Sequence, residues 1–324
     1  MAKRIPKAVW SHPGRDYQTG KASVRPMVER LAQAGFELIV PCLKGHGPVS
    51  YQSKVAHVAD WCKEWDPLAV LAEEAGRAGV KVHAWLCVFT EGEGSALVEK
   101  RTDLSALDPE GKKLDWACPR AQEVQDYAFS LYEELMGYDI AGVHLDYIRY
   151  GGQNSCYCPR CQRAFSEVHG LEPSRLGVRD ALRGDWLAFR AEPVTRFVER
   201  LSATVKGRGK ELSAAVFPDY PGCYVGVGQD WADWVERGLL DLLLPMNYTI
   251  STEVARRRTQ AHAAYVKGKV PLYEGLGKTS SHSHLPTKNL VAQVEAVLTA
   301  GADGICLFSH GGVTDEDLRA LKGF

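Results

Sequence analysis

The stretch AGVHLDYIRYGG, residues 141 to 152, has the length and composition of a fully buried strand, yet it contains a carboxylate, Asp146. His144 lies two positions before it and Arg149 three after it. Side chains alternate along a strand, so His144 and Asp146 share one face. The other face holds Val143, Leu145 and Tyr147. An acid buried among apolar groups costs several kcal/mol unless pairing or function retains it.

Seven further apolar runs of strand length alternate with amphipathic helical stretches. The eight predicted strands are residues 7–11, 36–42, 80–89, 141–148, 211–217, 239–248, 270–277 and 303–309. Several helical stretches end at a glycine before the next strand, at Gly35, Gly79, Gly268 and Gly301, where a left-handed residue is expected. Eight β-then-α units predict an α/β fold: a single (β/α)8 TIM barrel over residues 1–324, with one long insertion, residues 149–184, after the fourth strand.

The composition is that of an ordinary globular protein, with 45% hydrophobic and 24% charged residues among 324. Because 39 basic and 40 acidic residues leave a formal charge of −1, we expect neither nucleic acid nor a membrane as partner. The N-terminal MAKRIPKAVW has no apolar run of signal-peptide length, and no window approaches the roughly 20 apolar residues of a membrane span. We therefore expect a soluble, cytoplasmic protein in a reducing compartment; the oligomeric state stays open.

In a TIM barrel the carboxyl ends of the strands form the catalytic face. Alternation turns Asp146 toward this mouth, and likewise His83, Trp85, Cys87 and Phe89 of the third strand. Asp219 follows the fifth strand, and Glu274 lies at the same height on the seventh, although its facing stays open. Carboxylates and aromatic rings thus gather at the mouth: Asp146, Asp219, Glu274, Trp10, Trp85, Trp116, Tyr147 and Tyr248.

This mixture suits carbohydrate chemistry. Sugars stack their CH faces on aromatic rings, and cleavage of a glycosidic bond needs two carboxyl groups in different environments and no cofactor. We expect Asp146 to be catalytic, with Glu274 or Asp219 as the second carboxyl. A structural ion pair with Arg149, or a hydrogen bond to Tyr248, is the alternative for Asp146.

AGVHLDYIRY, together with HAWLCVF (83–89), DWACPRAQEVQDYA (115–128), QDWADWVERGLLDLLLPMNY (229–248) and GADGICLFSH (301–310), resembles glycosyl-hydrolase-like family 10 over nearly the whole chain. The resemblance implies a (β/α)8 barrel and hydrolysis of glycosidic bonds, with Asp146 as the catalytic residue. A weaker likeness to family 18 chitinases rests on Asp146 and on Met246-Asn247-Tyr248. Because Ile148 stands where the chitinase acid would be, the resemblance does not imply the chitinase mechanism.

Other polar side chains near the strand ends are candidates for substrate binding. His12 and His310 can bind sugar hydroxyls or serve only as rim residues, and His144 can orient the acid or be a core histidine. Asn247 and Tyr248 can orient substrate or pack. The full predicted substrate-binding set is His12, Trp85, Trp116, His144, Tyr147, Arg149, Asn247, Tyr248 and His310.

The predicted insertion contains CYCPRCQRAF, with Cys156, Cys158 and Cys161 within six positions. This spacing can supply three ligands of a tetrahedral structural zinc site, with His169 or Cys118 as the fourth. A disulfide within the loop and free thiols are the alternatives. A bound zinc ion would brace the loop over the mouth, since zinc with three thiolates has little open coordination for chemistry.

Two other functions fit the same barrel. A metal-dependent hydrolase could use the strand histidines His12, His83, His144 and His310 with Asp146, although the first strand lacks the H-x-H of amidohydrolases. A non-catalytic carbohydrate-binding barrel would keep the aromatic mouth without a second acid. The sugar, its linkage and the stereochemistry of cleavage are not set by the sequence.

Overall fold

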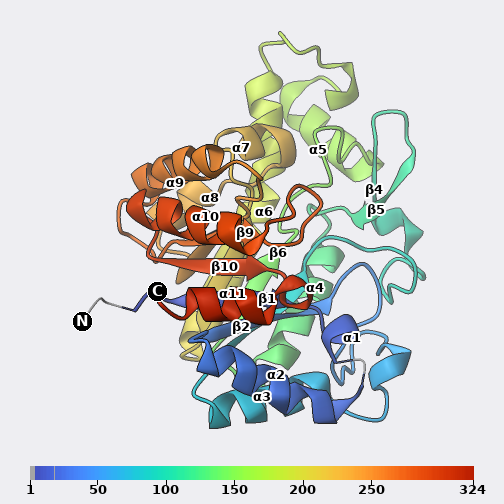
Figure 1. Ribbon diagram of the computed structural model, residues 1–324. Coiled ribbons are helices and arrows are strands. Elements are labelled where there is room, and N and C mark those ends of the chain that lie inside the picture. The colour runs from blue at the N-terminus through green and yellow to red at the C-terminus, as the bar shows by residue number, and fades with distance from the viewer. Residues whose placement is uncertain (1–3, 18) are drawn as a thin grey trace.

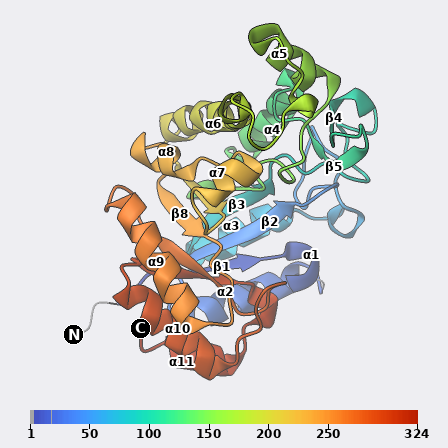
Figure 2. The same cartoon turned by 90° about the horizontal axis from the view of Figure 1, so that it is seen from above.

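The computed structural model describes residues 4–17 and 19–324, so residues 1–3 and 18 of the predicted domain lie outside the described residues. Over the described ranges, eight parallel strands and the helices between them form a nearly closed (β/α)8 TIM barrel, as predicted (Figures 1 and 2). The strands are β1 (Lys7–Ser11), β2 (Leu38–Lys44), β3 (Lys81–Cys87), β6 (Gly142–Asp146), β7 (Glu211–Val216), β8 (Leu242–Pro245), β9 (Tyr273–Gly277) and β10 (Gly304–Phe308).

The strand order is β8-β7-β6-β3-β2-β1-β10-β9. In the β3–β6 pair, Trp85 lies beside His144 and Cys87 beside Asp146. A parallel bridge from Leu243 to Leu272 joins β8 to the residues just before β9. This bridge brings the two edge strands together, so the strand ends surround one mouth.

The helices are α1 (Pro13–Asp16), α2 (Val24–Gln33), α3 (Pro67–Arg77), α4 (Gln122–Leu135), α5 (Pro159–His169), α6 (Arg183–Gly207), α7 (Gly222–Val227), α8 (Trp231–Glu236), α9 (Thr252–Val266), α10 (Thr287–Thr299) and α11 (Asp315–Leu321). Their ends follow local chemistry. Asp66 caps α3 through the backbone N–H groups of Leu68 and Ala69, ahead of Pro67. The four predicted helix-terminal glycines all have positive φ, between 68° and 110°. No helix in the described ranges is both long and apolar enough to cross a bilayer.

The two faces of the barrel strands pack in two different apolar layers. Val143 and Leu145 of β6 pack in the layer between barrel and helices. Trp85 and Cys87 of β3 and Phe308 of β10 lie inside the barrel, as alternation predicts. Phe89 was also predicted to point inward, and that is wrong. Because β3 ends at Cys87, the alternation stops there, and the Phe89 ring packs outside the barrel against Phe197 at 5.6 Å.

Two insertions stand above the strand ends. The sequence predicts the one after β6, which carries α5. The other follows β3 and contains the antiparallel hairpin β4 (Ser105–Leu107) and β5 (Lys113–Ala117), which the strand pattern did not reveal. In both views α5 and this hairpin lie side by side (Figures 1 and 2). The backbone N–H of Tyr157 donates to the carbonyl of Leu107 at 2.8 Å, which joins the two insertions.

Candidate active site

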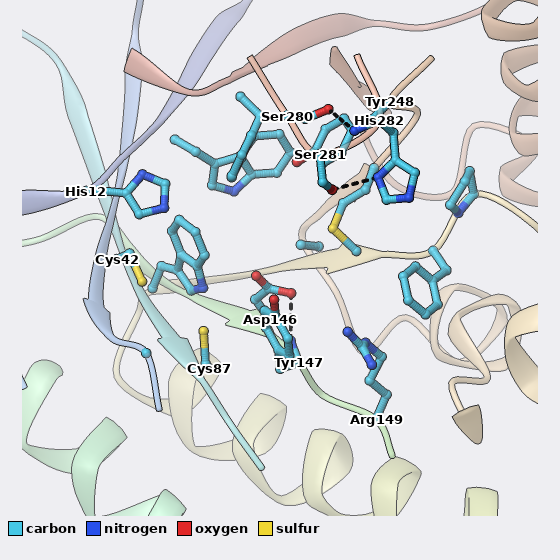
Figure 3. A pocket seen from close by; sticks show the side chains of 18 of the residues that line it. His12, Cys42, Cys87, Asp146, Tyr147, Arg149, Tyr248, Ser280, Ser281 and His282 are labelled. Carbon is cyan, nitrogen blue, oxygen red and sulfur yellow. Dashed lines mark hydrogen bonds between the residues drawn. The ribbon is translucent and has the colours of Figure 1, made fainter. Parts of the chain in front are cut away.

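A cavity of about 620 Å³ opens at the carboxyl ends of the strands (Figure 3). Its size lies within the range typical of small-molecule sites. Aromatic side chains form much of its wall, and Asp146 and Asp219 are its carboxylates among the described residues. The predicted site residues that line it are His12, Trp85, Asp146, Tyr147, Arg149, Asp219 and Tyr248.

Asp146 ends β6 and faces the cavity with only 5% of its surface exposed. Burial raises the pKa of its carboxyl from 3.8 to about 6, because a carboxylate loses hydration among apolar groups. The charge of Arg149, the backbone N–H of Tyr147 and the Trp85 indole partly oppose this rise. The acid can therefore hold or release a proton at near-neutral pH.

Tyr147 follows Asp146 with a left-handed backbone, φ 47°, which is costly for a bulky residue. Strand alternation alone would turn its ring outward with Val143 and Leu145. The left-handed turn instead brings the ring into the cavity wall, and it aims the Tyr147 N–H at Oδ1 of Asp146 at 2.6 Å (Figure 3). The strained residue thus supplies both a wall and a hydrogen bond to the acid.

Arg149 is 9% exposed and lies among three rings. Its guanidinium carbon is 5.0 Å from the Trp116 ring, 4.7 Å from Tyr147 and 4.5 Å from Phe217. Its Nη1 donates to the Tyr150 carbonyl at 3.1 Å, and its charge acts on Asp146 without a hydrogen bond to it. Trp116 does not line the cavity; it supports Tyr147 and Arg149 from behind.

Asp219 lies in the loop after β7, the strand next to β6, and also lines the cavity. Its side chain is 69% exposed and is 3.5 Å from Nε of Arg258, which also lines the cavity. Asp219 thus lies largely in solvent beside a cation, whereas Asp146 is buried among apolar groups. Asp146 and Asp219 therefore occupy contrasting environments.

The prediction that Glu274 lies at the mouth of the barrel is wrong. Glu274 is fully buried on the outer side of β9, because its neighbour Tyr273 takes the inward position. There it accepts from Nδ1 of His262 at 2.7 Å and from Nδ2 of Asn247 at 3.0 Å. Asn247 is likewise buried outside the cavity, and its Nδ2 also donates to the Ala255 carbonyl. Both residues face α9 rather than the cavity.

His144 lies beneath the cavity, fully buried. Trp10 Nε1 donates to His144 Nε2 at 3.2 Å, so the proton of His144 is on Nδ1, which donates to Ser213 at 2.8 Å. Ser213 in turn reaches Nδ1 of His83 at 2.9 Å, and His83 Nε2 donates to Glu211 at 3.1 Å. Burial lowers the pKa of His144 well below its usual range, so the ring is neutral. It supports the indole of Trp10, which lines the cavity.

His12 and Tyr248 both reach the cavity (Figure 3). Burial lowers the pKa of His12 to about 4, so its ring is neutral and can exchange hydrogen bonds with hydroxyls. His310 does not line the cavity; its Nδ1 lies 3.4 Å from Asp16. The strand histidines that a metal-dependent hydrolase would use therefore lie apart. His12 is in the cavity wall, His83 and His144 belong to the buried hydrogen-bond chain beneath it, and His310 is outside the lining. Among the described residues they form no ligand group.

Sequence reasoning missed the loop after β9. Ser280, Ser281 and His282 of this loop line the cavity (Figure 3). His46 and Arg258 also line it. For His46 and the loop after β9 the usable signal was position, because these residues follow the carboxyl end of a strand, where barrel loops carry chemistry. Arg258 lies within α9 and gave no such signal.

The predicted zinc ligands Cys156, Cys158 and Cys161 lie outside the cavity. They meet Cys118, and all four sulfurs lie within 4.8 Å of one another. His169, the other candidate for the fourth ligand, stacks on Phe165 at 4.2 Å and is no part of this group.

The sequence is similar to glycosyl hydrolases and their relatives. Residues 7–284 match the family described as Glycosyl hydrolase-like 10. Glycosyl hydrolase DigH of Escherichia coli O6:H1 is 23% identical over 278 residues, which cover 74% of this chain and 60% of that protein. The chain thus spans about 60% of the length of this curated relative.

Solved structures agree in fold. The PgaB (BpsB) glycoside hydrolase domain from Bordetella bronchiseptica superposes with a TM-score of 0.80 at 15% identity, covering 98% of both chains. Alpha-L-fucosidase isoenzyme 2 from Paenibacillus thiaminolyticus gives 0.69 at 18% identity, over 99% of this chain and 48% of that one. With the family match covering most of the sequence, the chain belongs to the Glycosyl hydrolase-like 10 family.

Proposed function

We propose that this protein is a glycoside hydrolase that cleaves O-glycosidic bonds of an oligosaccharide or polysaccharide at the carboxyl face of its barrel. The observation that carries the proposal is Asp146, a buried carboxyl with a pKa of about 6 in an aromatic-lined cavity. The family supports hydrolysis of sugars in general, and the residue roles below are part of the proposal.

Asp146 acts as the general acid. Departure of a sugar alkoxide needs a proton at the glycosidic oxygen, and a carboxyl with a raised pKa still carries one near neutral pH. The apolar wall that raises the pKa of Asp146 also excludes water, which strengthens the hydrogen bond to the leaving oxygen. Its Oδ1 is held by the Tyr147 N–H, leaving the second oxygen to face substrate.

Asp219 acts as the second carboxyl. It lies exposed beside Arg258 at the cavity lining, where it serves as the nucleophile or as the base that activates water. Carboxyl groups about 5 to 5.5 Å apart give retention, and about 6.5 to 9.5 Å give inversion. The anomeric configuration of the first product, read by proton NMR, reports which of these applies when substrate is bound.

The cavity wall binds the sugar. The rings of Trp85, Tyr147 and Tyr248 offer faces and edges on which sugar CH groups can pack. Neutral His12 and the guanidinium of Arg149 are hydrogen-bonding partners for hydroxyls. Carboxylate chemistry of this kind requires no cofactor.

The test is turnover of a panel of defined oligosaccharides, followed by mass spectrometry. Asp146→Asn and Asp219→Asn should each lower kcat by at least about a thousandfold while ligand affinity changes little, since each removes a group needed mainly in the transition state. Asp230→Asn is the matched control, because Asp230 opens α8, accepts from Tyr220 at 2.8 Å and lies outside the cavity. It should retain wild-type turnover.

Two results would count against the proposal. Turnover that survives Asp146→Asn removes the proposed acid. Sugar binding by wild-type protein, measured by calorimetry, without turnover of any ligand that binds would identify a carbohydrate-binding barrel instead.

A further inference from the structure

Four cysteine side chains meet outside the cavity, where the two insertions touch. Sγ of Cys118 lies 3.5 Å from that of Cys161 and 3.6 Å from that of Cys158. The Sγ atoms of these three residues and Cys156 all lie within 4.8 Å of one another. Each of the four side chains is at most 1% exposed.

The four residues come from separate parts of the chain. Cys118 follows β5 in the insertion after β3, whereas the other three lie in the insertion after β6. Figures 1 and 2 show α5 beside the β4–β5 hairpin, which is where these segments meet. A ligand bound by all four sulfurs would therefore join the two insertions.

These sulfur separations do not fit a disulfide. A disulfide holds its sulfurs about 2.05 Å apart, and all four thiols are free. They do fit a single tetrahedral metal ion, since four bonds of about 2.3 Å to zinc place the sulfurs about 3.8 Å apart. An iron–sulfur cluster would need room for several iron and sulfide atoms between the thiolates, and sulfurs within 4.8 Å leave none.

The start of α5 suits bound thiolates. Cys158 is the N-cap residue, Pro159 occupies the first helical position, and Cys161 lies in the first turn. Backbone N–H groups in a first turn have no partner within the helix, and the helix dipole there favours negative charge. Both effects would offset part of the charge that four thiolates place on one divalent ion.

We infer that Cys118, Cys156, Cys158 and Cys161 bind one structural zinc ion. Four protein ligands fill the tetrahedral coordination, so the ion has no open position for catalysis. Its role is to clamp the two insertions. Trp116 lies two residues before Cys118 and packs on Tyr147 at 5.7 Å, so the clamp also keeps the outer support of the cavity wall in place.

The first experiment measures metal content. Full-length protein purified under reducing conditions, without a histidine tag, should contain one zinc per chain by inductively coupled plasma and native mass spectrometry. Cys158→Ser should reduce bound zinc at least tenfold. Cys223→Ser is the matched control, because Cys223 is a buried thiol that donates to the Gln229 carbonyl and lies outside the cluster. It should keep its zinc.

A wild-type protein that contains no zinc while its four cluster cysteines are reduced thiols would overturn the inference. Stoichiometric iron, or equal zinc loss in both variants, would also overturn it. X-ray absorption on the wild type covers the case in which Cys158→Ser fails to fold. It should show four sulfur neighbours at about 2.3 Å, and a first shell of nitrogen or oxygen would contradict the site. Neither measurement depends on hydrolysis, so a failure of the zinc site can be distinguished from a failure of the proposed activity.

Discussion

Nδ1 of His262 donates to Glu274 at 2.7 Å behind the barrel wall, while Nε2 of the same ring donates to the carbonyl of Pro218 at 2.7 Å. With acceptors at both nitrogens, the ring carries both protons and is cationic. Burial alone would lower the pKa of His262, but the Glu274 carboxylate raises it overall. Pro218 directly precedes Asp219, so this buried ion pair anchors the loop that carries the proposed second carboxyl.

Glu274→Gln should therefore act mainly on stability. Removing one partner of a buried ion pair typically costs about 3–5 kcal/mol. Because the folded pKa of His262 is raised, the pair's stabilisation is present below pH 6.5 and is lost as pH rises through the folded pKa. Urea unfolding should show the largest deficit of the variant near pH 6 and a smaller one at pH 9. A deficit independent of pH would contradict the charged pair.

Asp146→Asn should have the opposite effect on stability. The folded pKa of Asp146 is raised to about 6, so its stabilising contribution is present below pH 3.8 and is lost as pH rises through 6. At pH 8 its ionisation costs the fold up to about 3 kcal/mol, from two pKa units at 1.36 kcal/mol each. Chemical denaturation should find the variant more stable than wild type at pH 8 and about equal at pH 4. Loss of stability at pH 8 would instead indicate a structural ion pair.

The pH dependence of kcat/KM should report the acid. If Asp146 must be protonated, kcat/KM falls about tenfold per pH unit above the pKa of about 6. Initial rates at substrate concentrations below KM, from pH 4.5 to 8.5, would measure this limb. A profile that rises through pH 6 would assign Asp146 to the ionised role and leave the acid elsewhere.

The charge of Arg149 should set the pH at which kcat/KM begins to fall. Its charge lowers the pKa of Asp146, opposing the effect of burial, so Arg149→Met should shift the fall in kcat/KM to higher pH. Arg149→Lys keeps the charge while losing the planar stacking on Trp116, so its limb should stay near pH 6 even if KM rises. Equal profiles for the two variants would show that the charge of Arg149 does not act on Asp146.

Much of the barrel follows from local patterns. Period-two alternation places Trp85, Cys87 and Asp146 inside, and glycines at positive φ end four helices where the sequence predicts. The same rule, applied strictly, turns Glu274 outward, since Tyr273 beside it points in. The carboxyl ends of barrel strands surround one mouth, which is why Asp146 and Asp219 could be expected at the cavity that both of them line.

Local patterns failed where the backbone departs from the strand. Phe89 lies past the end of β3, and Tyr147 reaches the cavity only through a left-handed turn that costs energy in isolation. The β4–β5 hairpin is short and only partly buried, so it leaves little periodicity to detect. Because the hairpin was not predicted, the sequence did not show that Cys118, which follows β5, can reach the insertion after β6.

The sequence by itself determined the ring of strands and the acid at its mouth, because strand alternation and helix termination depend on neighbours a few positions away. Only the tertiary structure decided that Glu274 pairs with His262 behind the wall, that Asp146 is buried enough to hold a proton, and that four thiols converge. These depend on distances between segments far apart in the chain, and on the solvent each side chain loses when those segments pack.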